Sequence, residues 1–176
     1  MSQNVIEAIE QRRSVRKFKP DPIPESFIQR ILNCGLSAPS AGNLQPWQLW
    51  VVKLPHLKAA LAEAACGQRF VEKAPVVIVV VAEPERSAAK YGSRGANIYC
   101  LQDTAALIQN MLLTATAFGI GSCWVGAFDE KTVGKVLGLS EGLRPVALLP
   151  MGYPAEVLYH PPRSKKPLTE TVITLE

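Results

Sequence analysis

The chain has 176 residues, of which 48% are hydrophobic and 19% are charged, and its formal net charge is +4. This composition excludes a disordered or fibrous chain, and so small a positive charge argues against a nucleic-acid binder with a dense basic face. Because domains usually hold about 100–200 residues, we expect one domain over residues 1–176.

The N-terminal third is predicted to hold two helices. The first spans about residues 5–12 and opens with a capping box between Asn4 and Glu7. After a proline-rich extended stretch, Pro24 opens the second helix, which Gly35 can end.

The middle of the chain predicts two strands with a helix between them. A polar loop over 37–47 leads into a strand over 48–53, and a helix follows over 55–66. The uninterrupted β-branched run 76–82 is typical of a strand covered on both faces, so we expect it at the centre of a sheet. The polar stretch 83–97 is expected to be a brief loop.

Apolar residues at three- and four-residue intervals predict a long helix over 101–118. Extended chain at 124–128, a short helix over 129–139 and a last strand over 144–154 follow. The tail ends in VITL at 172–175, which is expected to extend along an edge strand or a partner subunit.

The run between Asp103 and Asp129 has no charged residue and is long enough to cross a bilayer. Polar side chains interrupt its first half, however, and GIGS at 119–122 would place poorly packed backbone at mid-bilayer depth. A buried central helix is the better interpretation, and no membrane partner is expected.

The cysteine pattern gives no support for a metal site. Four cysteines lie far apart without a CxxC spacing: Cys34, Cys66, Cys100 and Cys123. Their small or apolar neighbours favour free, buried thiols in a reducing cytoplasm over disulfides. The N-terminus also lacks the apolar core of a signal peptide, so we expect a cytoplasmic protein.

Sequence motifs for hydrolysis and nucleotide binding are missing. The only histidines, His56 and His160, lie near no GxSxG elbow, and GIGSCWVG at 119–126 resembles a dinucleotide fingerprint but follows a helix instead of a strand. If the chain is an enzyme, a bound cofactor should therefore supply the difficult chemistry.

Two basic clusters could bind a phosphate. Arg12, Arg13, Ser14 and Arg16 lie where the first helix ends, and RSKK at 163–166 forms the second cluster. The alternative is ordinary: basic residues are favoured at helix C-termini by the macrodipole, and a basic tail can simply face water.

Two further segments could hold a flat heterocycle. The first contains Pro39, Ser40, Asn43 and Gln45, whose amides and backbone N–H groups suit the polar edge of such a ring. In the second, the glycines within 119–126 would let backbone approach an aromatic ligand. A plain loop and a helix cap followed by a turn are the alternatives.

Four segments taken together resemble the nitroreductase family of FMN-dependent oxidoreductases. They are RRSVRKF at 12–18, SAPSAGNLQPWQ at 37–48, the run 102–128 that ends in GIGSCWVGAF, and MGYPAE with the tail at 151–167. Four motifs in the same order with compatible spacing are specific for the family, although not for a substrate.

This resemblance implies an α+β fold with a central, mainly antiparallel sheet flanked by helices. It also implies an intertwined homodimer with FMN at each of two subunit interfaces, and NADH or NADPH as electron donor. It implies a ping-pong hydride transfer to nitroaromatic, quinone-like or related acceptors, with no catalytic side chain and no metal.

The resemblance assigns site residues position by position. Arg12, Arg13, Ser14 and, less directly, Arg16 would hold the FMN phosphate and ribityl chain. Near the carboxyl end, Arg163 and Lys165, with Lys166 as the alternative to Lys165, would grip the same phosphate.

The same resemblance assigns the ring contacts. Pro39, Ser40 and Asn43 would come from the other subunit and lie against the isoalloxazine, with Gln45 as an extra donor. The backbone of Val125 and Gly126 would lie near the flavin N5 edge.

Three alternatives remain open. Related flavin enzymes of the same fold dehalogenate aromatic compounds, cleave flavin or reduce enones. A non-catalytic FMN-binding module would carry the same motifs, and a generic phosphate-binding or interaction domain would use the basic clusters for another ligand.

Overall fold

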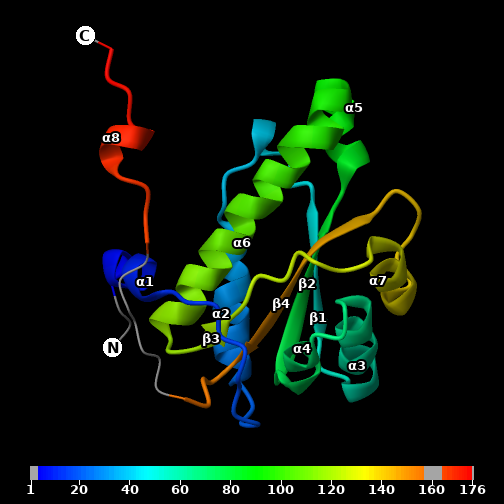
Figure 1. Ribbon diagram of the computed structural model, residues 1–176. Coiled ribbons are helices and arrows are strands. Elements are labelled where there is room, and N and C mark those ends of the chain that lie inside the picture. Colours follow the sequence, from blue (N-terminus) through cyan, green and yellow to red (C-terminus); the bar gives the residue numbers. More distant parts are fainter. Residues whose placement is uncertain (1–3, 157–163, 176) are drawn as a thin grey trace.

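The computed structural model describes residues 4–156 and 164–175 and shows helices on both faces of a small sheet (Figure 1). The α-helices are α1 (Val5–Gln11), α2 (Glu25–Leu36), α3 (Pro55–Ala64), α4 (Arg69–Lys73), α5 (Pro84–Arg94), α6 (Cys100–Ala117), α7 (Glu130–Leu137) and α8 (Leu168–Thr171). A 3-10 turn η1 (Ala41–Asn43) and a π-helical turn η2 (Gly95–Tyr99) join them. The strands are β1 (Trp47–Val52), β2 (Val76–Ala82), β3 (Gly121–Ser122) and β4 (Arg144–Gly152).

The predicted capping box of α1 is confirmed. The Asn4 side chain accepts a hydrogen bond from the Glu7 backbone N–H at 3.0 Å, and the Glu7 carboxylate accepts one from the Asn4 N–H at 3.3 Å. Together they satisfy two N–H groups that the first turn of a helix otherwise leaves without partners. Helix α1 consequently ends just before Arg12, which places the basic segment next.

The sheet has the order β1-β2-β4-β3, and all of its neighbouring strands are antiparallel. Strand β2 pairs on both edges, and all of its residues are buried, so its predicted central position is confirmed. The α+β architecture with an antiparallel sheet, which the resemblance implied, is also confirmed.

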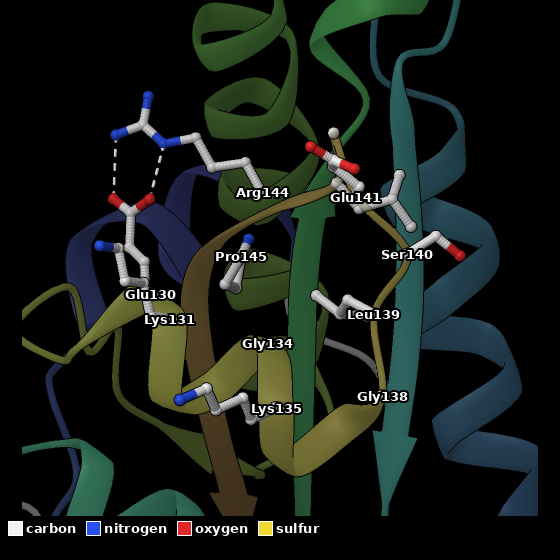
Figure 2. Close-up of a pocket in the computed structure, with 12 residues that line it drawn as sticks. Glu130, Lys131, Gly134, Lys135, Gly138, Leu139, Ser140, Glu141, Arg144 and Pro145 are labelled. Atoms are coloured by element: carbon white, nitrogen blue, oxygen red, sulfur yellow. Dashed lines mark hydrogen bonds and ion pairs between the residues drawn. The ribbon is translucent and has the colours of Figure 1, made fainter.

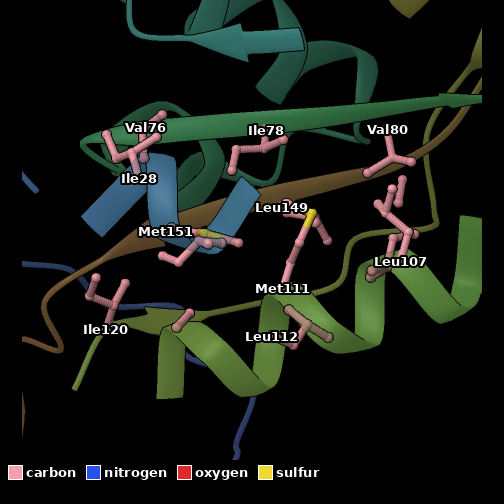
Figure 3. Close-up of a cluster of buried hydrophobic side chains, with 14 of the residues drawn as sticks. Ile28, Val76, Ile78, Val80, Leu107, Met111, Leu112, Ile120, Leu149 and Met151 are labelled. Atoms are coloured by element: carbon pink, nitrogen blue, oxygen red, sulfur yellow. The ribbon is translucent and has the colours of Figure 1, made fainter. Parts of the chain in front are cut away.

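Successive residues of β2 point to opposite faces and so build two cores. Val76, Ile78 and Val80 pack toward α2 and α6, where they meet Leu107 and Met111 (Figure 3). The alternate residues Val77, Val79 and Val81 pack toward α3, α4 and α7. Burial on both faces explains why this strand is a continuous apolar run instead of an alternating one.

Helix α6 forms the centre of the first core, as the sequence predicted. Its buried residues include Leu107, Ile108, Met111 and Leu112, on a helix that packs against both α2 and the sheet. None of the described helices has the length and apolarity needed to cross a membrane. The left-handed Gly119 (φ 70°) follows the end of α6 and turns the chain toward β3.

Two predictions about local structure are wrong. The stretch 83–97 is helical, because Pro84 occupies the first turn of α5 and Ser87 faces the interior; a break at Gly92 then leads into η2. The thiols are all free, but Cys66 is exposed and Cys34 half-buried. For residues 172–175, which were expected along an edge strand or a partner subunit, the structure shows no pairing with the described strands of their own sheet, and the partner alternative stays a prediction.

Helix α2 ends at Leu36, one residue after the predicted Gly35, and Gly35 itself packs against α6. A Cβ placed on Gly35 would lie 2.6 Å from Met111 Cγ and 3.0 Å from Met111 Sδ, and Met111 is fully buried. The glycine is therefore a packing residue that lets the two helices approach closely.

We expect Gly35→Ala to lower the free energy of unfolding by about 1–3 kcal/mol, because the added methyl overpacks the α2–α6 contact. The matched control is Gly134→Ala in α7, where a Cβ would meet nothing within 4 Å. That control should gain up to about 1 kcal/mol from helix propensity. Urea denaturation of both variants measures the difference, and a Gly35→Ala protein as stable as wild type would contradict the packing role.

Candidate functional site

The basic segment after α1 runs along the free edge of β3. Ser14 forms a parallel bridge with Ser122, and the Val15 N–H donates to the Ser122 carbonyl oxygen at 2.9 Å. A Cβ on Gly121 would lie 2.8 Å from Val15, so only glycine lets the two backbones come this close. The sheet edge therefore fixes the position of the segment that carries Arg12 to Arg16.

The side chains of Ser14 and Arg16 form hydrogen bonds with the buried thiol of Cys123, and the charge of Arg12 also acts on it. Burial raises the pKa of this thiol, while the charges of Arg16 and Arg12 and a hydrogen bond from Ser14 act in the opposite direction. The structure thus brings three of the four predicted phosphate-binding residues of this segment to one place. Two guanidinium groups and a hydroxyl are the donor set that a phosphate ester needs.

Arg13 has another role in this structure. Its guanidinium donates to the carbonyl oxygens of Glu10 at 2.6 Å and Arg12 at 3.0 Å. These are carbonyls at the end of α1, where cations are favoured by the helix macrodipole. Arg13 therefore fits the alternative given in the sequence analysis, in which a basic residue is favoured at the C-terminus of a helix.

Val125 and Gly126 lie farther along the same edge of the molecule. Val125 is buried and exchanges two backbone hydrogen bonds of 3.0 Å with Leu148 of β4. Gly126 is exposed, and a Cβ there would meet nothing within 4 Å. A rigid strand thus presents an open stretch of backbone that a flat ligand could approach.

The sequence predictions missed two side chains at this site. The Gln68 carboxamide donates to the Ala127 carbonyl oxygen at 3.3 Å, and the Phe70 ring lies 5.8 Å under the Arg16 guanidinium. Both follow the turn at Cys66 and Gly67, whose φ angles are 58° and 71°. The one sequence signal was Gly67, which marks a turn but says nothing about which segment the turn meets.

The loop 39–45, which carries the other predicted ring contacts, has hydrogen bonds between its own residues, and part of its backbone is in the left-handed conformation. The Ser40 hydroxyl accepts from the Gln45 N–H at 3.0 Å, and the Gln45 carboxamide donates to Asn43 at 3.2 Å. Gly42, Asn43 and Gln45 all have φ between 50° and 58°. Pro39, Asn43 and Gln45 are exposed, so their surfaces are available to a ligand.

This loop is attached to the beginning of α6. The Ala41 N–H donates to Asp103 Oδ1 at 3.0 Å, and Asp103 lies in the first turn of that helix. The segment 12–16, in contrast, is attached to β3, which follows the end of α6 (Figure 1). Phe118 lies fifteen positions after Asp103. At a helical rise of about 1.5 Å per residue, the two residues are about 22 Å apart along the helix axis. One chain therefore holds these two sets of predicted site residues at opposite ends of its central helix.

The predicted C-terminal clamp is placed only in part. Arg163 lies outside the described residues. Lys165 and Lys166 are exposed and precede α8. Within the described part of the chain, no group of three or more His, Cys, Asp and Glu side chains could hold a metal ion.

A hollow of about 410 Å³ beside α7 contains none of the predicted site residues (Figure 2). Its rim carries a two-bond ion pair in which the Arg144 guanidinium donates to both Glu130 carboxylate oxygens at 2.9 Å. The hydrogen bond with Glu130 raises the pKa of Arg144, so the positive charge of Arg144 is already paired with the Glu130 carboxylate. The hollow adds nothing to the site at the β3 edge.

Comparison with known proteins agrees with the resemblance. The profile of the Nitroreductase family matches residues 9–69 and 64–153. A relative from Thermus thermophilus named NADH dehydrogenase is 36% identical, over 92% of this chain and 91% of its own length.

Two solved structures share the fold along most of the chain. A nitroreductase family protein from Clostridium novyi NT is 32% identical, with a TM-score of 0.80 over 88% of this chain and 87% of its own. The NADPH:FMN oxidoreductase from Vibrio harveyi, solved in complex with NAD+, is 27% identical, with a TM-score of 0.86 over 99% of this chain and 78% of its own. The family profile, the sequence identity and the shared fold agree, and this chain belongs to the nitroreductase family.

Proposed function

We propose that the chain is an FMN-dependent oxidoreductase that takes hydride from NADH or NADPH and delivers it, in a separate step, to an electron-poor acceptor such as a nitroaromatic compound or a quinone. Family membership and the names of its relatives support the coarser statement that it is an NAD(P)H-dependent flavin oxidoreductase. The proposal adds the form of the flavin, the order of the steps and the class of acceptor. The observation that carries it is that Ser14, Arg16 and the charge of Arg12 act on Cys123, on the same sheet edge that continues to the open backbone of Gly126.

The residues at the β3 edge fit the phosphate of FMN. A phosphate ester carries about −1.5 to −2 charges at pH 7, and charge-assisted hydrogen bonds from arginine are among the strongest that proteins make. Arg12 and Arg16 would supply the charge and Ser14 a hydroxyl, with Arg13 supporting the helix end. Lys165 or Lys166, together with Arg163, is proposed to complete the clamp.

The open strand beyond this clamp fits the ring. When bound, the flavin supplies hydride acceptance and hydride donation. The chain's own residues then have three tasks: Val125 keeps the strand rigid, Gly126 leaves its backbone accessible to the ring, and Gln68 holds the Ala127 carbonyl in place. The nearby cations and backbone N–H groups would stabilise negative charge that develops on the bound ring. No side chain needs to act as an acid or a base.

The second set of ring contacts requires a second copy of the chain. Pro39, Ser40 and Asn43 lie at the far end of α6 from the clamp, so within one chain they do not reach the same ring. We therefore assign them to the flavin held by the partner, as the resemblance implied.

Exposed apolar surface supports this homodimer. Val5 and Ile6 on α1 are 63% and 60% exposed, beside a largely apolar hollow of about 400 Å³ between α1, α2 and α6. In the tail, Ile173 and Leu175 are 87% and 93% exposed. Exposed apolar side chains beside an apolar hollow favour an interaction site, and a second copy would cover it.

FMN and riboflavin binding separate the phosphate clamp from the ring site. We expect wild type to bind FMN more tightly than riboflavin, and Arg16→Gln to lose about 10-fold or more in FMN affinity through one charge-assisted contact. Riboflavin affinity should not change. Lys131→Gln, which removes an exposed cation on α7, is the matched control. Equal losses for both flavins after Arg16→Gln would contradict a phosphate clamp.

Turnover tests the absence of a catalytic side chain. Anaerobic NADH or NADPH should bleach the bound flavin of wild type, and a nitroaromatic or quinone acceptor should restore its colour. Ser40→Ala and Asn43→Ala should lower turnover only to the extent that they lower flavin occupancy. A variant with full flavin occupancy and no turnover would refute this mechanism, and a wild-type protein that takes up no FMN would refute the proposed function.

A further inference from the structure

We propose that Asp103 is a positioning residue for the flavin-binding loop: by accepting the hydrogen bond from the Ala41 N–H, its carboxylate fixes the segment 40–45 in the shape that meets the partner's flavin. The inference rests on the proposed function, because that function assigns Ser40 and Asn43 to the ring. Asp103 itself touches no flavin in this arrangement and acts through the loop.

The loop needs an external anchor because its own backbone preferences oppose its shape. Gln45 has a φ angle of 50°, in the left-handed region that residues other than glycine and asparagine seldom adopt, and Asn43 has a φ angle of 57° in the same region. Two of its internal bonds join side chains or backbone only two to five residues apart. Such local bonds do not fix where the loop lies relative to the rest of the fold.

Within the described residues, three hydrogen bonds connect the loop to other elements. The Glu83 N–H donates to the Pro46 carbonyl oxygen at 2.9 Å, and the Arg86 guanidinium donates to the Leu44 carbonyl oxygen at 2.5 Å. Both of these act at the carboxyl end of the loop, and the Arg86 side chain is more than half exposed. At the amino end, the side chains of Lys90 and Tyr91 lie against Gly42, but Asp103 supplies the hydrogen bond there, at the residue that follows Ser40, and it is only 7% exposed. It is the buried anchor of the three.

Burial of the Asp103 carboxylate costs free energy. Burial raises the pKa of the Asp103 carboxyl, and the bond from Ala41 offsets that effect only in part. Its second oxygen, Oδ2, is buried with no hydrogen-bond partner among the described residues. An apolar residue at this position would serve the core better, so the hydrogen bond to the loop is what the side chain contributes.

A helix-capping role does not explain Asp103. Acidic residues in a first turn usually interact with the free N–H groups there. Helix α6, however, continues directly from η2: Tyr99 has helical φ and ψ of −64° and −44°, and the Cys100 N–H already donates to the Gly95 carbonyl oxygen. The beginning of α6 therefore has no free N-terminus for the carboxylate to cap.

The test deletes each partner of the bond separately. Asp103→Ala removes the acceptor, whereas Asp103→Asn keeps an oxygen acceptor without the charge. Ala41→Pro removes only the donor, since Ala41 opens η1 and Ser40 has φ −141° and ψ 152°, which suit a residue before proline. Thr104→Ala, one residue along the same helix, is the matched control, because its buried hydroxyl bonds only to α6 carbonyls.

We expect Asp103→Ala and Ala41→Pro each to weaken FMN binding by about 10-fold, and the double variant to be no weaker than either. Asp103→Asn should bind FMN within about 2-fold of wild type, as should Thr104→Ala. In flavin-free protein, amide hydrogen exchange over residues 39–46 should accelerate in Asp103→Ala but not in Asp103→Asn.

Losses that multiply in the double variant would overturn the proposal, as would an Asp103→Ala protein with reduced thermal stability and unchanged FMN affinity. If Asp103→Ala does not fold, Asp103→Leu, which also removes the acceptor but fills the space of the side chain, replaces it in the cycle. A wild-type chain that takes up no FMN refutes the proposed function, whereas normal uptake by both wild type and Asp103→Ala refutes only the role of Asp103.

Discussion

The packing of α6 between α2 and the central strand is the constraint on which the rest of this structure depends. Leu107, Ile108 and Met111 are fully or almost fully buried against β2 and β4, so the helix is held as a straight rod inside the core. The loop 39–45 is bonded to its first turn, and β3 with the basic segment follows its last. The length of one helix thus sets the distance between the two halves of the proposed flavin site, and this distance is the reason that the proposal assigns each site to two copies of the chain.

The two halves of the proposed flavin site contribute different features: the β3 edge contributes positive charge and the loop contributes backbone shape. At the β3 edge, the antiparallel pairing fixes the path of residues 12–16, and the guanidinium groups of Arg12 and Arg16 converge on the site of Cys123. At the other end, a strained loop is held by the buried carboxylate of Asp103. In the proposed mechanism the bound cofactor performs the redox chemistry, so neither half needs a side chain for acid or base catalysis.

Structural features that depend on neighbouring residues in the sequence were predicted correctly. The capping box at Asn4, the β-branched run of β2 and the apolar periodicity of α6 all formed as expected, and the order of the motifs identified the family. The errors and omissions come from tertiary contacts. Gly35 was interpreted only as a helix end, yet it is also the point where α2 approaches Met111. The polar stretch 83–97 was interpreted as a loop because few apolar residues mark it, although burial of Ser87 and a proline start are enough for a helix there. Gln68, Phe70 and Asp103 had no signal, since their importance comes from partners far away in the sequence.

Mixed dimers test most directly whether each flavin site is built from both ends of two chains. One chain carries Arg12→Glu with Arg16→Glu, and the other carries Ser40→Glu with Asn43→Glu; each is expected to be inactive alone. In a mixed dimer one site combines both damaged halves and the other combines both intact halves, so random assortment after co-expression should restore about a quarter of wild-type NAD(P)H oxidation. If co-expression restores no activity while each parent protein is folded, or if the wild-type enzyme is active as a monomer, the shared site is contradicted.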